Sequence, residues 1–164
     1  MAPTNPDGAR DFDFLIGDWW VRHRRLERRL AHDTHWMEFC GPASVRSILG
    51  GLGNIDEIAI NLPTGPYVGA TLRLFNPSTR LWSIYWMDGR NPGLDPPQTG
   101  QFRGNRGLFY GDDAFEGRPI RVRFIWTVAS PTICRWEQAF SADEERSWET
   151  NWTMAFGASW SREL

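Results

Sequence analysis

The sequence predicts an all-β protein built as a single antiparallel up-and-down β-barrel of about 8 to 10 strands. Short strand-like runs are separated by clusters of Gly, Pro, Asn and Asp, and no long stretch shows the 3.6-residue apolar period of a helix. A Gly17-Asp18-Trp19 step leads into the first run, and Arg162 follows the last. In a small barrel, a Trp at this position closes one end, and an Arg from the last strand can lie across its indole ring.

The chain is long enough for one hydrophobic core, and we expect a single domain over residues 1–164. Residues 1–11 are polar and contain prolines, which predicts a flexible N-terminal arm. The segment 11–17 predicts a short helical turn, and its side chains Phe12, Phe14, Leu15 and Ile16 are placed to cap one end of the barrel.

The strand-like runs follow each other closely along the rest of the chain. They are expected at residues 19–31, 34–40, 43–49, 54–62, 68–75, 81–88, 99–103, 107–111, 119–128, 133–141 and 147–157. Turn residues such as His32-Asp33, Asn76-Pro77 and Asp143-Glu144-Glu145 lie between them. Each strand should therefore pair with the next, and closure into a barrel removes exposed sheet edges.

Composition excludes several classes of function. All 18 basic residues are Arg, so Schiff-base catalysis by a lysine and a phosphate-loop lysine are ruled out. The formal net charge of -2 argues against nucleic acid or an anionic membrane as the main partner. The ten Trp and ten Phe residues are far above ordinary usage, and we expect them to line an interior. A small-molecule partner is the expectation that remains.

Cys40 and Cys134 are too few and too far apart for a disulfide framework or a Cys-x-x-Cys metal site. The expectation is two free thiols, no metal and no cofactor. No apolar segment reaches the length of a membrane span, and the first ten residues lack a signal-peptide core, so a cytoplasmic location is predicted.

Five segments carry a resemblance to a known family. They are Gly17-Asp18-Trp19, Leu72-Arg73-Leu74-Phe75-Asn76-Pro77, Trp82-Ser83-Ile84-Tyr85-Trp86, the run from Arg135 to Ser141, and Trp148-Glu149-Thr150-Asn151-Trp152. Together they resemble a bacterial family of uncharacterised calycin-like proteins, the domain of unknown function 1579 group, over nearly the whole chain. More distantly, the Gly-x-Trp step and terminal Arg resemble the lipocalin and fatty-acid-binding barrels, which implies a barrel around a ligand cavity.

The last hairpin predicts which side chains face inward. A turn at residues 143–145 sets Trp136 opposite Trp152, Gln138 opposite Thr150 and Cys134 opposite Met154. On the other face, the arginines and glutamates would form ion pairs in solvent. The alternative inverts the faces: fatty-acid-binding barrels hold interior arginines, so the resemblance implies that Arg73, Arg123 or Arg135 could anchor an acidic ligand.

The first hairpin offers the most plausible acid-base chemistry. If Trp19 points inward, strict alternation places His23, Arg25, Glu27 and Arg29 on the same side, and a turn at His32-Asp33 sets Glu27 opposite Glu38. Two carboxylates that share a site raise one pKa, and a nearby histidine can relay a proton. The alternative is that a bulge turns these charges outward.

The function predicted from these observations is the binding of a small apolar or aromatic ligand. The candidate walls are Trp36, Trp82, Trp86, Phe124, Trp126, Trp136, Gln138, Trp152 and Met154. A rival hypothesis is an isomerase, cyclase or dehydratase that uses His23 or Glu38 as base and Tyr85 or Arg73 to stabilise negative charge. Two further alternatives are a haem-binding barrel with His23 as ligand and a solid barrel whose outer surface forms a homodimer.

Overall fold

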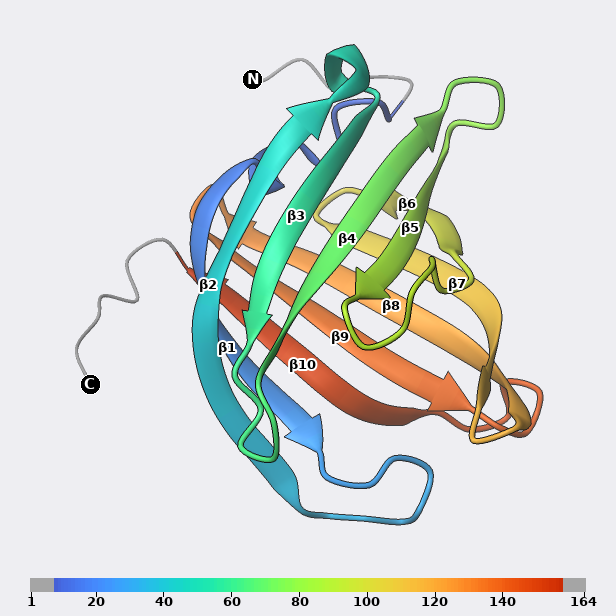
Figure 1. Cartoon of the computed structure of the whole chain (residues 1–164). Coiled ribbons are helices and arrows are strands. Elements are labelled where there is room, and N and C mark those ends of the chain that lie inside the picture. Colours follow the sequence, from blue (N-terminus) through green and yellow to red (C-terminus); the bar gives the residue numbers. More distant parts are fainter. Residues whose placement is uncertain (1–7, 158–164) are drawn as a thin grey trace.

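The computed structural model describes residues 8–157, and Arg162 lies outside this range. Ten antiparallel strands form a closed barrel in which each strand pairs with the next and β1 pairs with β10 (Figure 1). The strands are β1 (Gly17–Leu26), β2 (Trp36–Ile48), β3 (Gly53–Ile60), β4 (Tyr67–Asn76), β5 (Leu81–Asp88), β6 (Gln98–Arg103), β7 (Arg106–Phe115), β8 (Arg118–Ser130), β9 (Ile133–Ser141) and β10 (Glu149–Gly157). The predicted fold class is confirmed. Two short 3₁₀ turns, η1 (Asp13–Leu15) and η2 (Leu49–Gly51), are added to the barrel.

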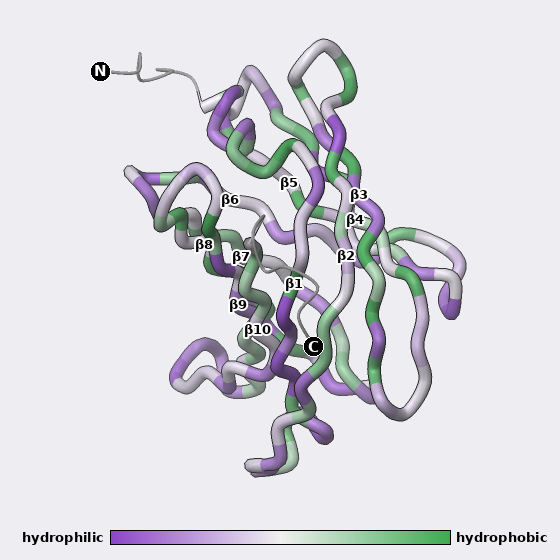
Figure 2. The backbone as a smooth tube through the Cα atoms, turned by 90° about the vertical axis from the view of Figure 1, so that its left-hand side faces the viewer, coloured by the Kyte–Doolittle hydropathy of each residue, from purple (hydrophilic) through white to green (hydrophobic). Residues whose placement is uncertain are grey.

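Alternation along the strands separates the inner face from the outer face. Hydrophobic and hydrophilic residues alternate along much of the backbone (Figure 2). In β1, Trp19, Val21, His23 and Arg25 are buried, whereas Arg22 and Arg24 between them are exposed. The period of two therefore continues without a bulge to Arg25, and this charged side chain lies on the inner face.

The N-terminal segment closes one end of the barrel. Phe12 is 1 % exposed and packs edge-on against Trp82 and Phe102, with ring centroids 5.0 Å apart in both pairs. The Trp82 Nε1–H group donates a hydrogen bond to the carbonyl oxygen of Gly8 at 2.9 Å. The described end of the predicted arm is thus part of the core.

Gly17 turns the chain from η1 into β1. Its φ of 130° lies in a region that side chains beyond glycine rarely adopt. Two residues later, Trp19 is buried and donates a hydrogen bond from Nε1 to the carbonyl oxygen of Leu15 at 2.7 Å. This bond fixes the end-closing segment against the first strand.

The two ranges predicted at 34–40 and 43–49 form one continuous strand, β2. The sequence prediction placed a break near Pro42. This proline is accommodated because β3 pairs with β2 only from Ala43 onward, so Pro42 lies beyond that ladder.

Both hairpin registers differ from the prediction. Glu38 lies opposite Arg24 rather than Glu27, because residues 27–35 form a loop in which the Asp33 carboxylate accepts the backbone N–H groups of Arg28 and His35. In the last hairpin, Trp152 lies opposite Gln138 rather than Trp136, and a register shift occurs between Thr150 and Trp152. From Trp152 onward this slip is of two residues, so Trp152 and Met154 still face inward. Thr150, before the shift, lies opposite Ala139 rather than the predicted Gln138 and does not line the cavity.

No helix among residues 8–157 has the length and apolar character needed to cross a membrane.

Candidate functional site

The barrel encloses a cavity of about 530 Å³. The apolar lining comes mainly from strands β5 and β7–β10, while most of the charged lining comes from β1, β3, β4 and the β5–β6 loop. The principal lining side chains are Arg25, Arg29, Asp56, Tyr67, Arg73, Trp86, Asp88, Arg90, Asp95, Gln98, Asp113, Phe124, Trp126, Trp136, Gln138, Phe140, Trp152 and Met154. A volume of this size suits a small organic molecule, and it excludes a barrel packed solid with side chains.

The floor of the cavity carries a buried ion pair. Arg73 Nη2 lies 2.8 Å from Asp56 Oδ2, and Arg73 Nη1 donates to Asn54 Oδ1 at 2.8 Å. The other Asp56 oxygen accepts the backbone N–H of Thr71 at 3.0 Å. Arg73 and Asp56 are only 4 % and 7 % exposed, so each charge depends on the other for compensation.

Two hydrogen-bond donors near this floor have no protein partner. Arg73 Nε and Trp126 Nε1 are buried and make no hydrogen bond, although both residues line the cavity. The Arg73 guanidinium carbon lies 5.6 Å from the centroid of the Trp126 ring. Both atoms are covered by neighbouring protein atoms, so neither is presented to a molecule in the cavity.

Aromatic side chains form one wall. Trp152 packs edge-on against Trp136 and Trp86, with centroids 5.7 and 5.9 Å apart, and Phe124 lies 5.0 Å from Trp136. Gln138 belongs to the same wall and donates from Nε2 to Asn151 Oδ1 at 2.9 Å. The wall therefore presents flat rings suited to an apolar or aromatic molecule.

The position of Trp86 in this wall depends on Gly69. A Cβ atom at Gly69 would overlap the six-membered ring of Trp86. We expect Gly69→Ala to displace this indole and to weaken binding of an aromatic probe at least fivefold. The measurement is probe titration with circular dichroism to verify the fold. Gly89→Ala is the matched control, since its Cβ would meet no atom within 4 Å; equal affinities for the two variants would contradict the expected role.

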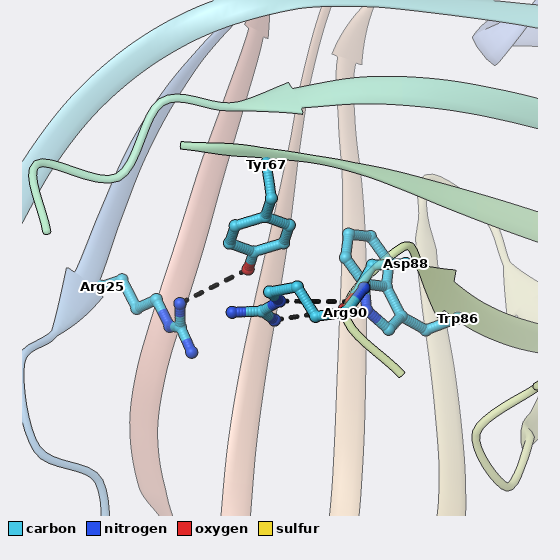
Figure 3. Close-up of polar contacts among 5 residues, drawn as sticks. All are labelled: Arg25, Tyr67, Trp86, Asp88 and Arg90. Carbon is cyan, nitrogen blue, oxygen red and sulfur yellow. Dashed lines mark hydrogen bonds and ion pairs between the residues drawn. The ribbon is translucent and has the colours of Figure 1, made fainter. Parts of the chain in front are cut away.

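The open end of the cavity is rich in arginine. Arg25 lies on the inner face of β1 and Arg29 follows in the loop, while Arg90 comes from the loop after β5. Arg90 binds Asp88 through Nε and Nη2 at 3.2 and 3.1 Å and lies 3.5 Å from the centroid of the Tyr67 ring. Figure 3 shows Arg25 and Arg90 directed toward each other beside Tyr67.

One carboxyl group of the lining holds its proton more readily than usual. Burial raises the pKa of Asp95, and the nearby carboxylates of Asp113 and Asp88 raise it further. By contrast, the hydrogen bonds from Arg90 hold the pKa of Asp88 below its ordinary value.

His23 lies behind the aromatic wall rather than in it. It is 1 % exposed, stacks on Phe39 with centroids 4.6 Å apart and is absent from the cavity lining. Its Nδ1 atom accepts a hydrogen bond from Trp152 Nε1 at 3.1 Å, so the neutral ring carries its proton on Nε2. Burial lowers the pKa of His23 to about 3, with a smaller effect from Arg25. This histidine is a neutral support for Trp152 and does not face a ligand.

The structure brings together most of the predicted wall residues but separates the predicted acid-base set. Trp86, Phe124, Trp126, Trp136, Gln138, Trp152 and Met154 line the cavity, and so does Arg73. Trp82 instead packs on Phe12 at the closed end. The two-residue period of a strand predicts which face of the sheet a side chain lies on, so these residues were correctly placed inside. It does not predict how far along the barrel axis a side chain lies, and Trp82 therefore lies outside the cavity.

Three predicted site residues lie on the outer face. Glu38 is exposed and pairs with Arg24 at 3.1 Å, and Trp36 stacks on the same arginine, with its ring centroid 5.0 Å from Arg24 Cζ. Tyr85 lies between the inward-facing Ile84 and Trp86, so it points outward. Glu38 and Tyr85 therefore cannot share a site with His23. The register error in the first hairpin placed Glu38 opposite the wrong residue.

Arg123 and Arg135, the other arginines considered for an acidic ligand, also lie outside. Arg123 stacks on Trp148 at 4.5 Å, and Arg135 lies 3.5 Å from Glu137. Arg135 therefore fits the predicted outer ion pairs, whereas Arg123 packs on an aromatic ring and has a buried Nε without a hydrogen-bond partner. Arg73 alone of the three lines the cavity.

Neither cysteine shows the properties of a nucleophile at this site. Both are free, and burial raises the pKa of the Cys134 thiol to about 12. Within residues 8–157, no group of three or more His, Cys, Asp or Glu side chains is arranged to hold a metal ion.

The chain matches no known protein family, and no curated protein matches it significantly.

Proposed function

We propose that this protein binds a small, largely apolar or aromatic molecule inside its barrel. The observation that carries the proposal is the cavity of about 530 Å³, which has one aromatic wall and charged side chains along the rest of its lining. Cavities of roughly 300–1,000 Å³ are typical of small-molecule sites.

The closed ten-strand topology also supports our proposal that the chain is a member of the calycin-like group described above. In a barrel of this kind, ligand specificity comes from the inner side chains and from the loops at the open end.

The cavity is tested with a neutral aromatic probe, N-phenyl-1-naphthylamine, whose emission rises in an apolar environment. We expect saturable binding by the wild-type protein. Val122→Trp should raise the Kd at least fivefold, because Val122 lines the cavity and the larger ring would occupy part of it.

The matched control is Thr127→Trp, which adds the same ring to β8 at a residue outside the cavity lining. Its probe affinity should equal that of the wild type. Circular dichroism and thermal unfolding establish that both variants fold. Failure of the folded wild-type protein to bind the probe, or an equal loss of affinity in both variants, would overturn the proposal.

A further inference from the structure

The cavity lining near its open end contains three arginines, Arg25, Arg29 and Arg90, and three aspartates, Asp88, Asp95 and Asp113. Among residues 8–157, the Asp88 carboxylate forms an ion pair with Arg90, and no carboxylate forms an ion pair with Arg25 or Arg29. Asp88 also accepts a hydrogen bond from Trp86 Nε1 at 3.1 Å, so its oxygens are already engaged. Two guanidinium groups at the cavity mouth thus lack an acidic partner.

Arg25 is buried despite this lack of compensation. It is 8 % exposed, and its Nη1 atom donates a long hydrogen bond of 3.5 Å to the hydroxyl of Tyr67. Its guanidinium carbon lies 4.8 Å from the centroid of the Trp152 ring. The ring gives a modest attraction to the cation, but it does not replace a counter-charge.

Arg29 is half-buried and also lies over aromatic rings. Its guanidinium carbon lies 4.9 Å from the ring of Phe115 and 5.7 Å from that of Phe140. Burial lowers the pKa of Arg29 to about 10, and the positive charge of Arg25 lowers it further. Tyr67 and, to a smaller extent, Glu116 raise the pKa of Arg29.

The arrangement is suited to an anion because binding would supply what each group lacks. A guanidinium that is removed from water costs free energy until a counter-charge and hydrogen bonds replace its hydration. Arginine pairs with carboxylate or phosphate oxygens through two parallel hydrogen bonds, and the Tyr67 hydroxyl can donate to the same group. Arg73 offers no such site, since Asp56 and Asn54 already occupy both terminal nitrogens of its guanidinium.

We propose that Arg25 and Arg29, together with Tyr67, bind an anionic oxygen group, a carboxylate or a phosphate, on a ligand whose apolar part lies against the aromatic wall. This inference rests on the proposed binding function and adds the chemical class of the ligand. The anion lies at the open end, so the apolar part enters first and the charged group stays at the mouth.

Isothermal titration with four naphthalene compounds tests the charge at constant ring shape. They are neutral 2-naphthol, 2-naphthoate, naphthalene-2-sulfonate and 2-naphthyl phosphate. We expect the charged compounds to bind at least tenfold more tightly than 2-naphthol. Comparison of naphthoate with naphthyl phosphate identifies which of the two anions the site prefers.

Arg25→Gln should reduce the ratio of affinities between the charged compounds and 2-naphthol to less than threefold. Arg29→Gln should reduce the same ratio by a smaller amount. The matched control is Arg24→Gln, which removes the same charge from the neighbouring residue on the outer face and should keep the wild-type preference. Titration with N-phenyl-1-naphthylamine shows whether each variant retains the cavity.

The two proposals fail in different ways. If the folded wild-type protein does not bind the naphthylamine, the proposed binding function fails. If 2-naphthol binds as tightly as its charged analogues while the naphthylamine still binds, the anion site is overturned and the cavity function stands. An equal loss of preference in Arg24→Gln and Arg25→Gln would likewise overturn the anion site.

Discussion

Asp56→Asn is expected to lower the free energy of unfolding by about 3–5 kcal/mol, because it leaves the buried Arg73 without its counter-charge. The amide would retain an oxygen for the Thr71 N–H group, so the loss reports mainly on the charge. Urea unfolding at pH 7 measures the change.

Two controls separate charge compensation from general damage. Glu38→Gln removes one partner of the exposed pair with Arg24 and should cost less than about 1 kcal/mol. The double variant Asp56→Leu/Arg73→Met removes both buried charges and should recover much of the lost stability. A cost for Asp56→Asn no larger than that for Glu38→Gln would contradict the inferred role of the ion pair.

Acidification should destabilise the barrel through His23. The folded protein binds a proton at His23 only near pH 3, whereas the unfolded chain binds one near pH 6.5. The unfolded state therefore holds more protons between these values, and stability falls as the pH falls. From pH 8 to pH 5, this one residue should remove about 2 kcal/mol of unfolding free energy.

His23→Phe keeps a ring on Phe39 and removes the titrating group, so the variant should lose most of this pH dependence. It should be less stable than the wild type at pH 8 by about 1–3 kcal/mol, because Trp152 Nε1 loses its acceptor. His35→Gln is the control, since it removes an exposed imidazole and leaves the buried contacts of His23 in place. Unfolding measured in urea at pH 8, 6.5 and 5 gives the profiles; the same slope in wild type and His23→Phe would show that another group is responsible.

The fold could be predicted because most strands carry the same two signals. Alternation marks the inner face, and turn residues mark the ends, so errors in single strands do not change the architecture. The break predicted near Pro42 shows the limit of this reasoning. A proline is compatible with a strand wherever the ladder on one side is absent, and that depends on tertiary pairing.

The candidate site could be predicted only where it lies within strands. Trp136 and Trp152 face inward even though their predicted register was wrong by two residues. The predicted partner of Glu38 depended on the length of the first turn. The observed loop, residues 27–35, is longer than the predicted turn, so Glu38 has a different partner. Tyr67 and Arg90 meet because separate loops end at the same barrel mouth, and no period in the sequence relates them.

Pairing of β1 with β10 joins the two ends of the described chain, from Trp20 opposite Gly157 to Arg25 opposite Trp152. Such contacts span most of the sequence and carry a large loop-closure entropy, so they are expected late in folding and slow its rate. During synthesis, β1 must wait without this partner until the last strand leaves the ribosome. The contacts of Trp152 with His23 and Arg25 belong to that final step, so a chain that lacks β10 would form neither the closed barrel nor the ligand cavity.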